Sequence, residues 1–295
     1  MVVVLTFNCE AIVGQTLAQA LRLCTRPFVV DSHSTDRTVE IARSLGCQVV
    51  QRPFKNYSEQ RNWAIAEVAG LSRWQLHLDA DEVLDDAAVR EITAIAASSA
   101  PGHRAYMIRR IDCFMGRQLR HSGLNPWHLR LFMSGHGVCE DRLYDQHFIA
   151  DAPAGRLRGC MHDKTCVSLS DWTARHNRWS DLEVAELARG LGAKDSVLKG
   201  RLRGDPRERM RWLKGLYYRL PGGVRSLAYF GYRYVLRLGF LDGREGFYFA
   251  ALQAFWFRVL VDAKAYERSK AMPAEPTPAA AAAEVDATEP GRPTA

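Results

Sequence analysis

Two strand-like segments of this 295-residue chain end in carboxylates. Residues 74–82 read Trp-Gln-Leu-His-Leu-Asp-Ala-Asp-Glu, and residues 28–36 read Phe-Val-Val-Asp-Ser-His-Ser-Thr-Asp. In open α/β sheets, ligands bind at the edge where the parallel strands end. Only the small Ala80 separates Asp79 from Asp81, so both carboxylates can turn toward one hard cation. A divalent metal that bridges a diphosphate is the chemistry that suits this pair best.

Strand and helix patterns alternate along the first part of the chain. Hydrophobic segments typical of strands lie at 2–7, 27–31, 47–50 and 74–78. Helix patterns lie between them, and capping residues mark where the helices start. The expected helices are 11–23, one from Ser34 or Asp36 to Gly46, one from Ser58 to Gly70, and one that Asp85 caps. This alternation predicts an α/β fold with a mostly parallel sheet and right-handed crossovers.

The rhythm of the pattern changes after Pro101. The later elements expected are strands at 106–111 and 129–132, a helix from Ser170 to about Gly190, and aromatic-rich helices over 226–266. The Pro- and Ala-rich end of the chain has little to bury, which is typical of disorder. The sequence therefore predicts a catalytic core at 1–165, a helical extension at 166–270 and a disordered tail at 271–295.

Positive charge is concentrated in one stretch. Residues 199–225 carry nine Lys and Arg against Asp205 and Glu208, a net charge of +7 that equals the charge of the whole chain. Such a cluster attracts the phosphates of nucleic acid, of an anionic membrane or of a glycolipid. A solvated helical face is the alternative interpretation.

The remaining composition favours a reduced cytoplasmic protein. The seven cysteines are odd in number and form no Cys-x-x-Cys motif. Met1 runs directly into an apolar strand pattern without a charged leader, so no signal peptide is expected. The apolar segment 247–257 is shorter than the roughly 20 residues that span a bilayer. It is expected to be a buried helix or one that lies in the membrane interface.

Several motifs carry a resemblance to a known family. In order and spacing, Thr-Phe-Asn-Cys-Glu at 6–10, 30–36, Gln-Arg-Asn-Trp-Ala at 60–64 and 78–82 resemble family-2 glycosyltransferases. Those enzymes have the GT-A fold, which is Rossmann-like, and invert configuration at the anomeric carbon. Three later stretches, 116–123, 130–132 and 239–247, resemble a bacterial subgroup that adds sugars to lipopolysaccharide core. The resemblance covers residues 2–266.

The resemblance implies a nucleotide pocket. Thr6, Phe7 and Glu10 would line it, Asp31 would accept a hydrogen bond from the base, and Arg61 would flank the same pocket. An aspartate in such a place also forms turns and caps helices. That simpler role is favoured for Asp36, and the binding role for Asp31.

The resemblance also implies a metal site for Mg²⁺ or Mn²⁺. Asp81 would be the direct ligand, and Asp79 would contact the ribose or the metal. The cation would act as a Lewis acid on the departing nucleoside diphosphate. His162 is a candidate third ligand, although a lone histidine is more often structural. An acidic loop before a helix is the alternative, and it accounts for Asp85 and Asp86.

Inversion needs a base that takes the proton of the acceptor hydroxyl. The subgroup usually carries Val-His-Glu where this chain has Val-Cys-Glu at 138–140. Glu140 is therefore the expected base, with the adjacent Asp141 as the second candidate. Cys139 in place of histidine is a poorer hydrogen-bond partner, which affects acceptor positioning. A solvated acidic pair is the alternative interpretation.

Two groups of residues outside these motifs complete the expectation. Arg109, Arg110, Arg120 and Arg130 are candidates for gripping the diphosphate or acceptor phosphates. The aromatic helices near the C-terminus pack as core or lie on an anionic inner membrane.

The expected function is transfer of a hexose, from a UDP-linked donor, to a cell-envelope glycan or lipid-linked acceptor such as lipopolysaccharide core. The enzyme would be cytoplasmic, with peripheral contact to the inner face of the membrane. The alternatives are a metal-dependent phosphatase, a sugar-nucleotide pyrophosphorylase, or a basic module that binds membrane or nucleic acid. No nucleic-acid partner is expected, because no DNA- or RNA-reading motif is present.

Overall fold

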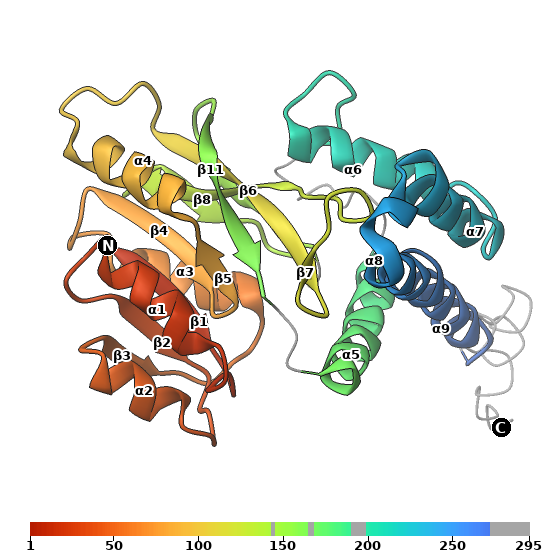
Figure 1. Cartoon of the computed structure of the whole chain (residues 1–295), viewed down its shortest axis with the longest axis horizontal. Helices are drawn as coiled ribbons and strands as arrows, with labels where there is room; N and C mark the ends of the chain where they lie inside the picture. The colour runs from red at the N-terminus through yellow and green to blue at the C-terminus, as the bar shows by residue number, and fades with distance from the viewer. Residues whose placement is uncertain (143–144, 165–167, 190–198, 272–295) are drawn as a thin grey trace, which may run out of the picture.

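A mixed β-sheet forms the centre of the molecule (Figure 1). The computed structural model describes residues 1–142, 145–164, 168–189 and 199–271. The sheet has nine strands in the order β3-β2-β1-β4-β8-β6-β11-β5, with β7 paired to β6. Strands β3, β2, β1 and β4 are parallel, whereas β8 runs antiparallel to both β4 and β6. The expected parallel arrangement therefore holds for the first four strands, and the sheet becomes mixed beyond them.

The first half of the chain alternates strands and helices as the sequence predicts. The elements are β1 (Val2–Thr6), α1 (Val13–Leu21), β2 (Phe28–Asp31), α2 (Thr38–Ser44), β3 (Gln48–Gln51), α3 (Tyr57–Glu67), β4 (Trp74–Asp79), β5 (Glu82–Leu84) and α4 (Asp86–Ala97). The strands that follow are β6 (Ala105–Phe114), β7 (Arg117–Gln118), β8 (Trp127–Met133), β9 (Gly137–Cys139), β10 (Phe148–Ala150) and β11 (Gly155–Asp163). Strands β9 and β10 form a separate antiparallel pair.

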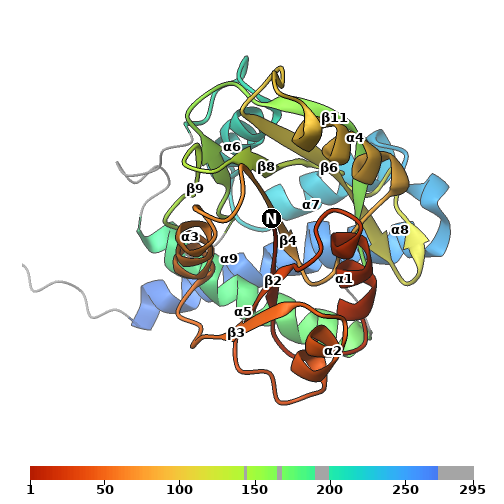
Figure 2. The ribbon, with the colours of Figure 1, turned by 90° about the vertical axis from the view of Figure 1, so that its left-hand side faces the viewer.

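Alternating side chains of β1 supply both faces of the sheet. Val2 and Val4 pack with the apolar residues of α1, α2 and α4, whereas Val3 packs with Ala64 and Val68, which belong to α3 and the turn after it. This arrangement follows from the two-residue period of a strand. Figure 2 shows α1 and α2 on one side of the sheet and α3 on the other. The helices bury both faces, and the edge where β1, β2 and β4 end stays available for polar groups.

Helices make up the C-terminal part of the described chain. They are α5 (Leu169–Ala188), α6 (Pro206–Tyr217), α7 (Val224–Gly231), the π-helical turns η1 (Tyr232–Leu236) and η3 (Ala250–Trp256), the 3₁₀ turn η2 (Gly239–Asp242), α8 (Gly243–Phe249) and α9 (Phe257–Ala271). Figure 1 shows this helical region beside the sheet. Phe249 packs against Phe114 and Trp172, and Phe257 packs against Val184. Part of the aromatic sequence is therefore core, as one of the two interpretations expected.

The expected domain division at 165 stays a prediction. The sheet ends at Asp163 and α5 begins at Leu169, and the boundary itself lies outside the described residues. The tail expected to be disordered, 271–295, also lies outside them except for Ala271, which ends α9.

The helix starts differ in detail from the sequence prediction. Asp85 caps α4, with its Oδ1 accepting from Ala88 N at 2.7 Å, as expected. Two other caps were predicted wrongly, because a polar residue two positions earlier takes the role. Asn56 caps α3 in place of Ser58, and Ser168 caps α5 in place of Ser170. Helix α2 has Arg37 at its N-cap position with no side-chain hydrogen bond there.

Candidate active site

Three polar side chains meet at one edge of the sheet because their strands are neighbours. Thr6 is paired with Asp31 in the register of β1 and β2, and Leu5 is paired with Asp79 in that of β1 and β4. The strands are parallel, so their carboxyl ends lie together. Thr6, Asp31 and Asp79 therefore face the same loop region, as the sequence predicts.

Asp31 is fully buried and organises the loops around it. Its carboxylate accepts hydrogen bonds from Thr6 Oγ1 at 3.0 Å, Ser34 N at 2.8 Å, Ser34 Oγ at 2.5 Å and Gln51 Nε2 at 3.1 Å. A carboxylate offers about four acceptor positions, so these four donors satisfy it. Asp31 thus joins β1, β2 and β3 at the edge. Its expected contact with a base stays a prediction.

Two loops at this edge are tied together by polar contacts. Glu10 accepts from Arg37 N at 2.9 Å, and Glu10 N donates to Asp36 Oδ2 at 3.0 Å. Asp36 also accepts from Thr38 N at 3.0 Å, which agrees with the simpler role expected for it. Phe7, by contrast, is 61% exposed. The segment after β1 therefore leaves the Phe7 ring open to solvent, and its expected contact with a nucleotide stays a prediction.

Asp79 is held by two arginines from different elements. Arg61 Nη2 of α3 lies 2.6 Å from its Oδ1, and Arg130 Nη2 of β8 lies 2.9 Å from its Oδ2. Arg130 also binds Glu82 Oε1 at 2.5 Å. Burial opposes the ionisation of Asp79, but the charges of Arg61 and Arg130 outweigh it and lower the pKa of the carboxyl. Asp79 is therefore an anion whose oxygens are both engaged.

The ring of Phe148 contacts both arginines that bind Asp79. The guanidinium carbon of Arg61 lies 4.9 Å from the ring centroid, and that of Arg130 lies 5.8 Å from it. Such cation–π contacts strengthen when water is excluded. Sequence reasoning missed Phe148, because no local pattern connects it to the acidic motif.

Asp81 lies in a more crowded setting. Its Oδ2 is 3.6 Å from Arg175 Nη1 of α5. Burial, reinforced by the charge of Asp79, raises the pKa of Asp81. Burial also raises the pKa of Asp163 well above its usual value, and the charge of Asp81 adds to this effect while Arg110 opposes it. Asp163 Oδ1 is a buried acceptor that has no hydrogen-bond partner among the residues that the structure describes. The sequence analysis did not single out Asp163, although it ends a strand as Asp79 does.

The divalent cation expected from the acidic motif stays a prediction. Within the described ranges, no three His, Cys, Asp or Glu side chains are placed to hold a metal ion together. Mg²⁺ is often bound by one or two carboxylates plus substrate phosphates, which does not require such a group. The raised pKa values of Asp81 and Asp163 reflect buried negative charge that a cation would stabilise.

His162 lies apart from this pair of carboxylates. Neighbouring residues of a strand point to opposite faces, so His162 faces away from the side that Asp163 occupies. Its Nδ1 is 3.3 Å from Gln118 Nε2. The structure does not bring His162 to Asp81, and its role as a third ligand stays a prediction.

Glu140 is buried in an ion-pair network. Arg211 of α6 binds it with two nitrogens, at 2.8 Å to Oε2 and 2.6 Å to Oε1. His147 adds contacts at 2.9 Å from its backbone N and 3.0 Å from its Nδ1. Burial opposes ionisation, but the hydrogen bonds from Arg211 and His147 lower the pKa of Glu140 to about 2. In this conformation Glu140 is a weak proton acceptor.

Asp141 is exposed beside Glu140. The backbone of this segment is anchored to α3, because Ser58 Oγ donates to Glu140 O at 2.6 Å. The preceding residue, Tyr57, has a pKa raised by burial and then by the charge of Asp79. Residues 140–142 therefore lie against the same helix that presents Arg61 to Asp79.

The four arginines expected to grip phosphates divide into two pairs. Arg130 and Arg110 are committed to carboxylates, with Arg110 placed 3.3 Å from Asp112 and 3.5 Å from Asp163. Arg109 and Arg120 instead line a cavity together with His162. The second pair is available to a ligand.

A model of glycosyl transferase family 2 matches residues 1–149, which is half of the chain. This protein belongs to glycosyl transferase family 2. Its sheet order and helical C-terminal region, together with this membership, confirm the expected GT-A fold. The phosphatase and pyrophosphorylase interpretations are left without support.

Relatives resemble only part of the chain. An uncharacterized glycosyltransferase of Rickettsia typhi is 34% identical over 116 residues, and another of Rickettsia bellii is 36% identical over 107 residues. The matches span 39% and 36% of the length of those relatives and the same shares of this chain.

Among solved structures, glucosyl-3-phosphoglycerate synthase of Mycobacterium tuberculosis with Mn²⁺, UDP-glucose and phosphoglyceric acid has 20% identity and a TM-score of 0.30, covering 38% of this chain and 42% of that one. TarS of S. aureus has 15% identity and a TM-score of 0.38, covering 84% of this chain and 54% of that one. Such distant likeness assigns no residue and no substrate.

The Glu140 network predicts a pH-dependent contribution to stability. Glu140→Gln leaves Arg211 without its carboxylate, so we expect a loss of about 3 kcal/mol near neutral pH. The pKa of Glu140 falls from 4.5 to about 2 on folding, so its contribution is complete above pH 4.5 and fades as the pH falls toward 2. Urea unfolding of both proteins at pH 6.5 and pH 3 measures the difference.

The control for this experiment is Glu67→Gln, at the exposed end of α3. It should change the free energy of unfolding little at either pH. An equal effect of Glu140→Gln at both pH values would contradict the assignment.

Proposed function

We propose that this protein is an inverting glycosyltransferase that moves a hexose from a nucleotide-sugar, UDP-linked, to a cell-envelope glycan or glycolipid. The observation that carries the proposal is the shared strand edge of Thr6, Asp31 and Asp79, with Asp81 immediately after it, in a member of glycosyl transferase family 2. The resemblance of three sequence motifs to the lipopolysaccharide core subgroup supports an acceptor of that kind.

The donor would lie along the strand edge. Thr6, Phe7, Glu10 and Asp31 form the loops that receive the base and ribose, and Arg61 sets the charge at the diphosphate end through Asp79. A bound Mg²⁺ or Mn²⁺ would supply Lewis-acid stabilisation of the leaving diphosphate. Asp81 would hold this cation, because both oxygens of Asp79 are already engaged by arginines.

The proton of the acceptor hydroxyl would pass to Asp141. Of the two acidic residues expected from the sequence, Glu140 has both oxygens bound by Arg211, whereas Asp141 is exposed. A carboxylate with free lone pairs near the reacting hydroxyl is the better base. Glu140 would act as a positioning residue that fixes the segment and Arg211.

Two variants test which residue is the base, and in each an amide of nearly the same shape replaces the carboxylate. Asp141→Asn should lower transfer by about 10²- to 10⁴-fold, because the base is lost, without weakening donor binding. Glu140→Gln should destabilise the protein and reduce transfer less. The readout is release of UDP from UDP-glucose, with a lipopolysaccharide preparation as acceptor. Loss of transfer in a folded Glu140→Gln protein, with normal activity in Asp141→Asn, would reverse the two roles.

We also propose that the helical region rests on an anionic membrane. Most of the exposed large hydrophobic side chains lie between residues 210 and 259. Helix α7 begins at Val224, and the spacing of three residues places Val224 and Leu227 on one face, where they are 63% and 62% exposed. Leu220, in the segment before this helix, is 46% exposed. Soluble proteins rarely leave so many apolar side chains together in water.

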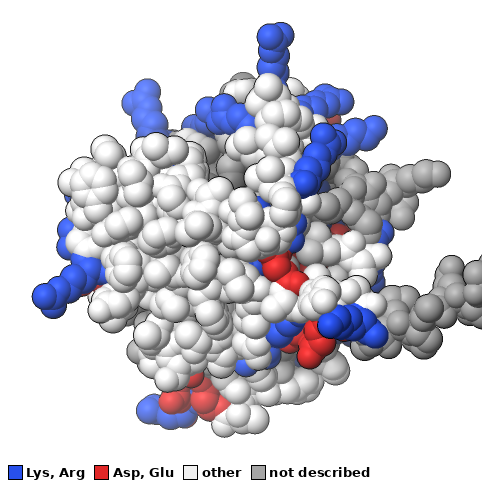
Figure 3. All heavy atoms as spheres, turned by 90° about the vertical axis from the view of Figure 1, so that its right-hand side faces the viewer, with Lys and Arg blue, Asp and Glu red and all other residues white. Residues whose placement is uncertain are grey.

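The charges around this surface complement anionic lipid. Of the nine cations in 199–225, four bind carboxylates and five are exposed: Lys199, Arg201, Arg203, Arg209 and Arg219. Figure 3 shows a broad area without charged side chains on this side of the molecule, with Lys and Arg projecting around it. In the described part of the chain, no helix is long and apolar enough to cross a bilayer. Contact in the interface is the arrangement that such a surface fits.

Membrane contact predicts a loss of vesicle binding in Val224→Asp and Leu227→Asp. Each substitution removes an apolar contact worth about 1.5–3 kcal/mol, so affinity for vesicles with anionic lipid should fall about tenfold or more. Sedimentation with vesicles measures it, and added salt should weaken binding further. Leu71→Asp, at a 59% exposed site of the catalytic core, is the control. Vesicle binding by Val224→Asp and Leu227→Asp that equals binding by Leu71→Asp would contradict the proposal.

A further inference from the structure

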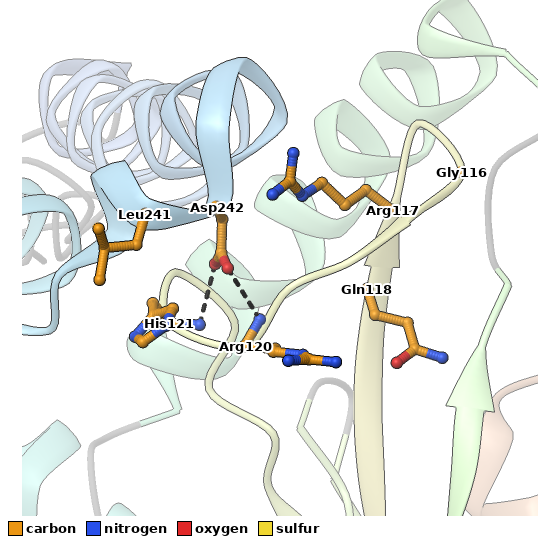
Figure 4. Close-up of a pocket in the computed structure, with 7 residues that line it drawn as sticks. All are labelled: Gly116, Arg117, Gln118, Arg120, His121, Leu241 and Asp242. Atoms are coloured by element: carbon orange, nitrogen blue, oxygen red, sulfur yellow. Dashed lines mark hydrogen bonds between the residues drawn. The ribbon is translucent and has the colours of Figure 1, made fainter.

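Two sequence motifs that the donor site does not use fold against each other. Residues 116–123 and 239–247 are more than a hundred positions apart, yet Asp242 joins them (Figure 4). Its carboxylate accepts from the backbone N of Arg120 at 3.1 Å, of His121 at 2.9 Å and of Ser122 at 2.7 Å. Ser122 Oγ donates to it as well, at 2.8 Å. One buried carboxylate thus fixes the shape of the loop.

Glycines allow this close packing. A Cβ on Gly239 would lie 2.6 Å from Arg233 O, and a Cβ on Gly246 would lie 2.4 Å from Gly239 O. A Cβ on Gly123 would lie 2.8 Å from Leu119 O. No side chain fits at such distances, so backbone contact explains the glycine at these three positions, whereas Gly116 and Gly243 have positive φ angles of 79° and 72°. The loop is therefore a rigid platform rather than an exposed turn.

The platform borders a cavity of about 450 Å³. Its lining residues are Gly116, Arg117, Gln118, Arg120, His121, Leu241 and Asp242. A second cavity of about 320 Å³ shares Gln118 and Arg120 with it and adds Arg109 and His162. Cavities of about 300–1,000 Å³ are typical of small-molecule sites.

The carboxylates that line the two cavities, Asp242 and Asp85, do not pair with the arginines that line them. Asp242 is saturated by backbone donors, and these lower its pKa against the opposing effect of burial. Asp85, at the second cavity, accepts from the backbone N of Ala88 and Cys160. Arg109 and Arg120 are exposed and form no ion pair within the described ranges. Arg117 is half-exposed, and its Nη1 lies 3.4 Å from Glu245 Oε2, an ion pair that a bound phosphate would have to share. Exposed guanidinium groups of this kind bind phosphate with two parallel hydrogen bonds.

The cavity is connected to the strand edge that would hold the donor. Leu119 N donates to Asp112 O at 2.9 Å, and Leu124 N donates to Asp112 Oδ2 at 3.0 Å. Asp112 and Asp163 share Arg110, and Lys164 N, of the residue after Asp163, donates to Asp81 O at 2.9 Å. The platform is thus anchored, through Asp112, to the strand that carries Arg110, the partner of Asp163.

We propose that this cavity binds a phosphate group carried by the acceptor saccharide, with Arg117 and Arg120 as its ligands and Arg109 beside them. This role rests on the proposed glycosyltransferase function, because it assigns the acceptor to a phosphorylated sugar. Leu241, 53% exposed at the rim, belongs also to the apolar surface of the helical region, so a lipid-linked glycan could reach the cavity along the membrane.

The test is binding of glucose 6-phosphate to the full-length protein, measured by calorimetry beside glucose and inorganic phosphate. We expect glucose 6-phosphate to bind at least tenfold more tightly than either. Arg120→Gln and Arg117→Gln should each weaken it about tenfold, and Arg120→Lys should restore part of the loss. Arg43→Gln, an exposed arginine on α2, is the matched control. Absence of binding, or equal affinity in wild type and Arg120→Gln, would overturn the proposal.

Two further measurements distinguish a sugar phosphate from a lipid headgroup, and distinguish failure of this proposal from failure of the proposed function. If vesicles with phosphatidic acid, but not glucose 6-phosphate, lose binding in Arg120→Gln, the cavity holds a lipid headgroup and the proposal fails. Asp81→Asn should bind glucose 6-phosphate as the wild type does. If the wild type binds no nucleotide-sugar yet binds glucose 6-phosphate through Arg120, the cavity stands and the proposed function falls.

Discussion

The ion pairs of Asp79 hold the centre of this molecule together. Asp79 ends β4, and its two oxygens bind arginines from α3 on one side and from the antiparallel β8 on the other. The pairs are mostly buried, so losing one partner would leave an uncompensated charge in a poorly solvated place. This network fixes where the parallel half of the sheet meets the mixed half. Asp81, two residues later, has one arginine near it, at 3.6 Å, in place of two.

A second buried carboxylate, farther along the chain, also binds several donors from distant segments. Asp242 satisfies three backbone N–H groups of a loop more than a hundred residues away, as Asp79 satisfies two arginines. Each of these two carboxylates has a structural role, and each lies near a group that we propose as a ligand-binding residue: Asp81 in one case and Arg120 in the other. The proposed donor site and the proposed acceptor cavity thus each depend on one buried carboxylate. Asp112, Arg110 and Asp163 link the two regions.

The sequence predicted what depends on local pattern. The first four strands and their order along the chain follow from short apolar segments, and Asp31 and Asp79 follow from where those segments stop. The caps at Ser58 and Ser170 were wrong because Asn56 and Ser168 offer the same chemistry nearby. The partners of Glu140 and Asp242 could not be predicted, since Arg211 and Ser122 are 71 and 120 residues away from them. Contacts of that length depend on tertiary packing, which leaves no periodic signal.

The proposed function depends on Asp81, which would hold a divalent cation for the diphosphate of a nucleotide-sugar. Thermal unfolding with a panel of nucleotide-sugars, with and without Mn²⁺, tests it most directly. A ligand that binds only the folded state raises the Tm. We expect a UDP-sugar to raise the Tm of the wild type only when Mn²⁺ is present, and to leave the Tm of Asp81→Asn unchanged. A folded, Mn²⁺-saturated wild type that responds to no nucleotide-sugar, or an Asp81→Asn protein that responds fully, would contradict it.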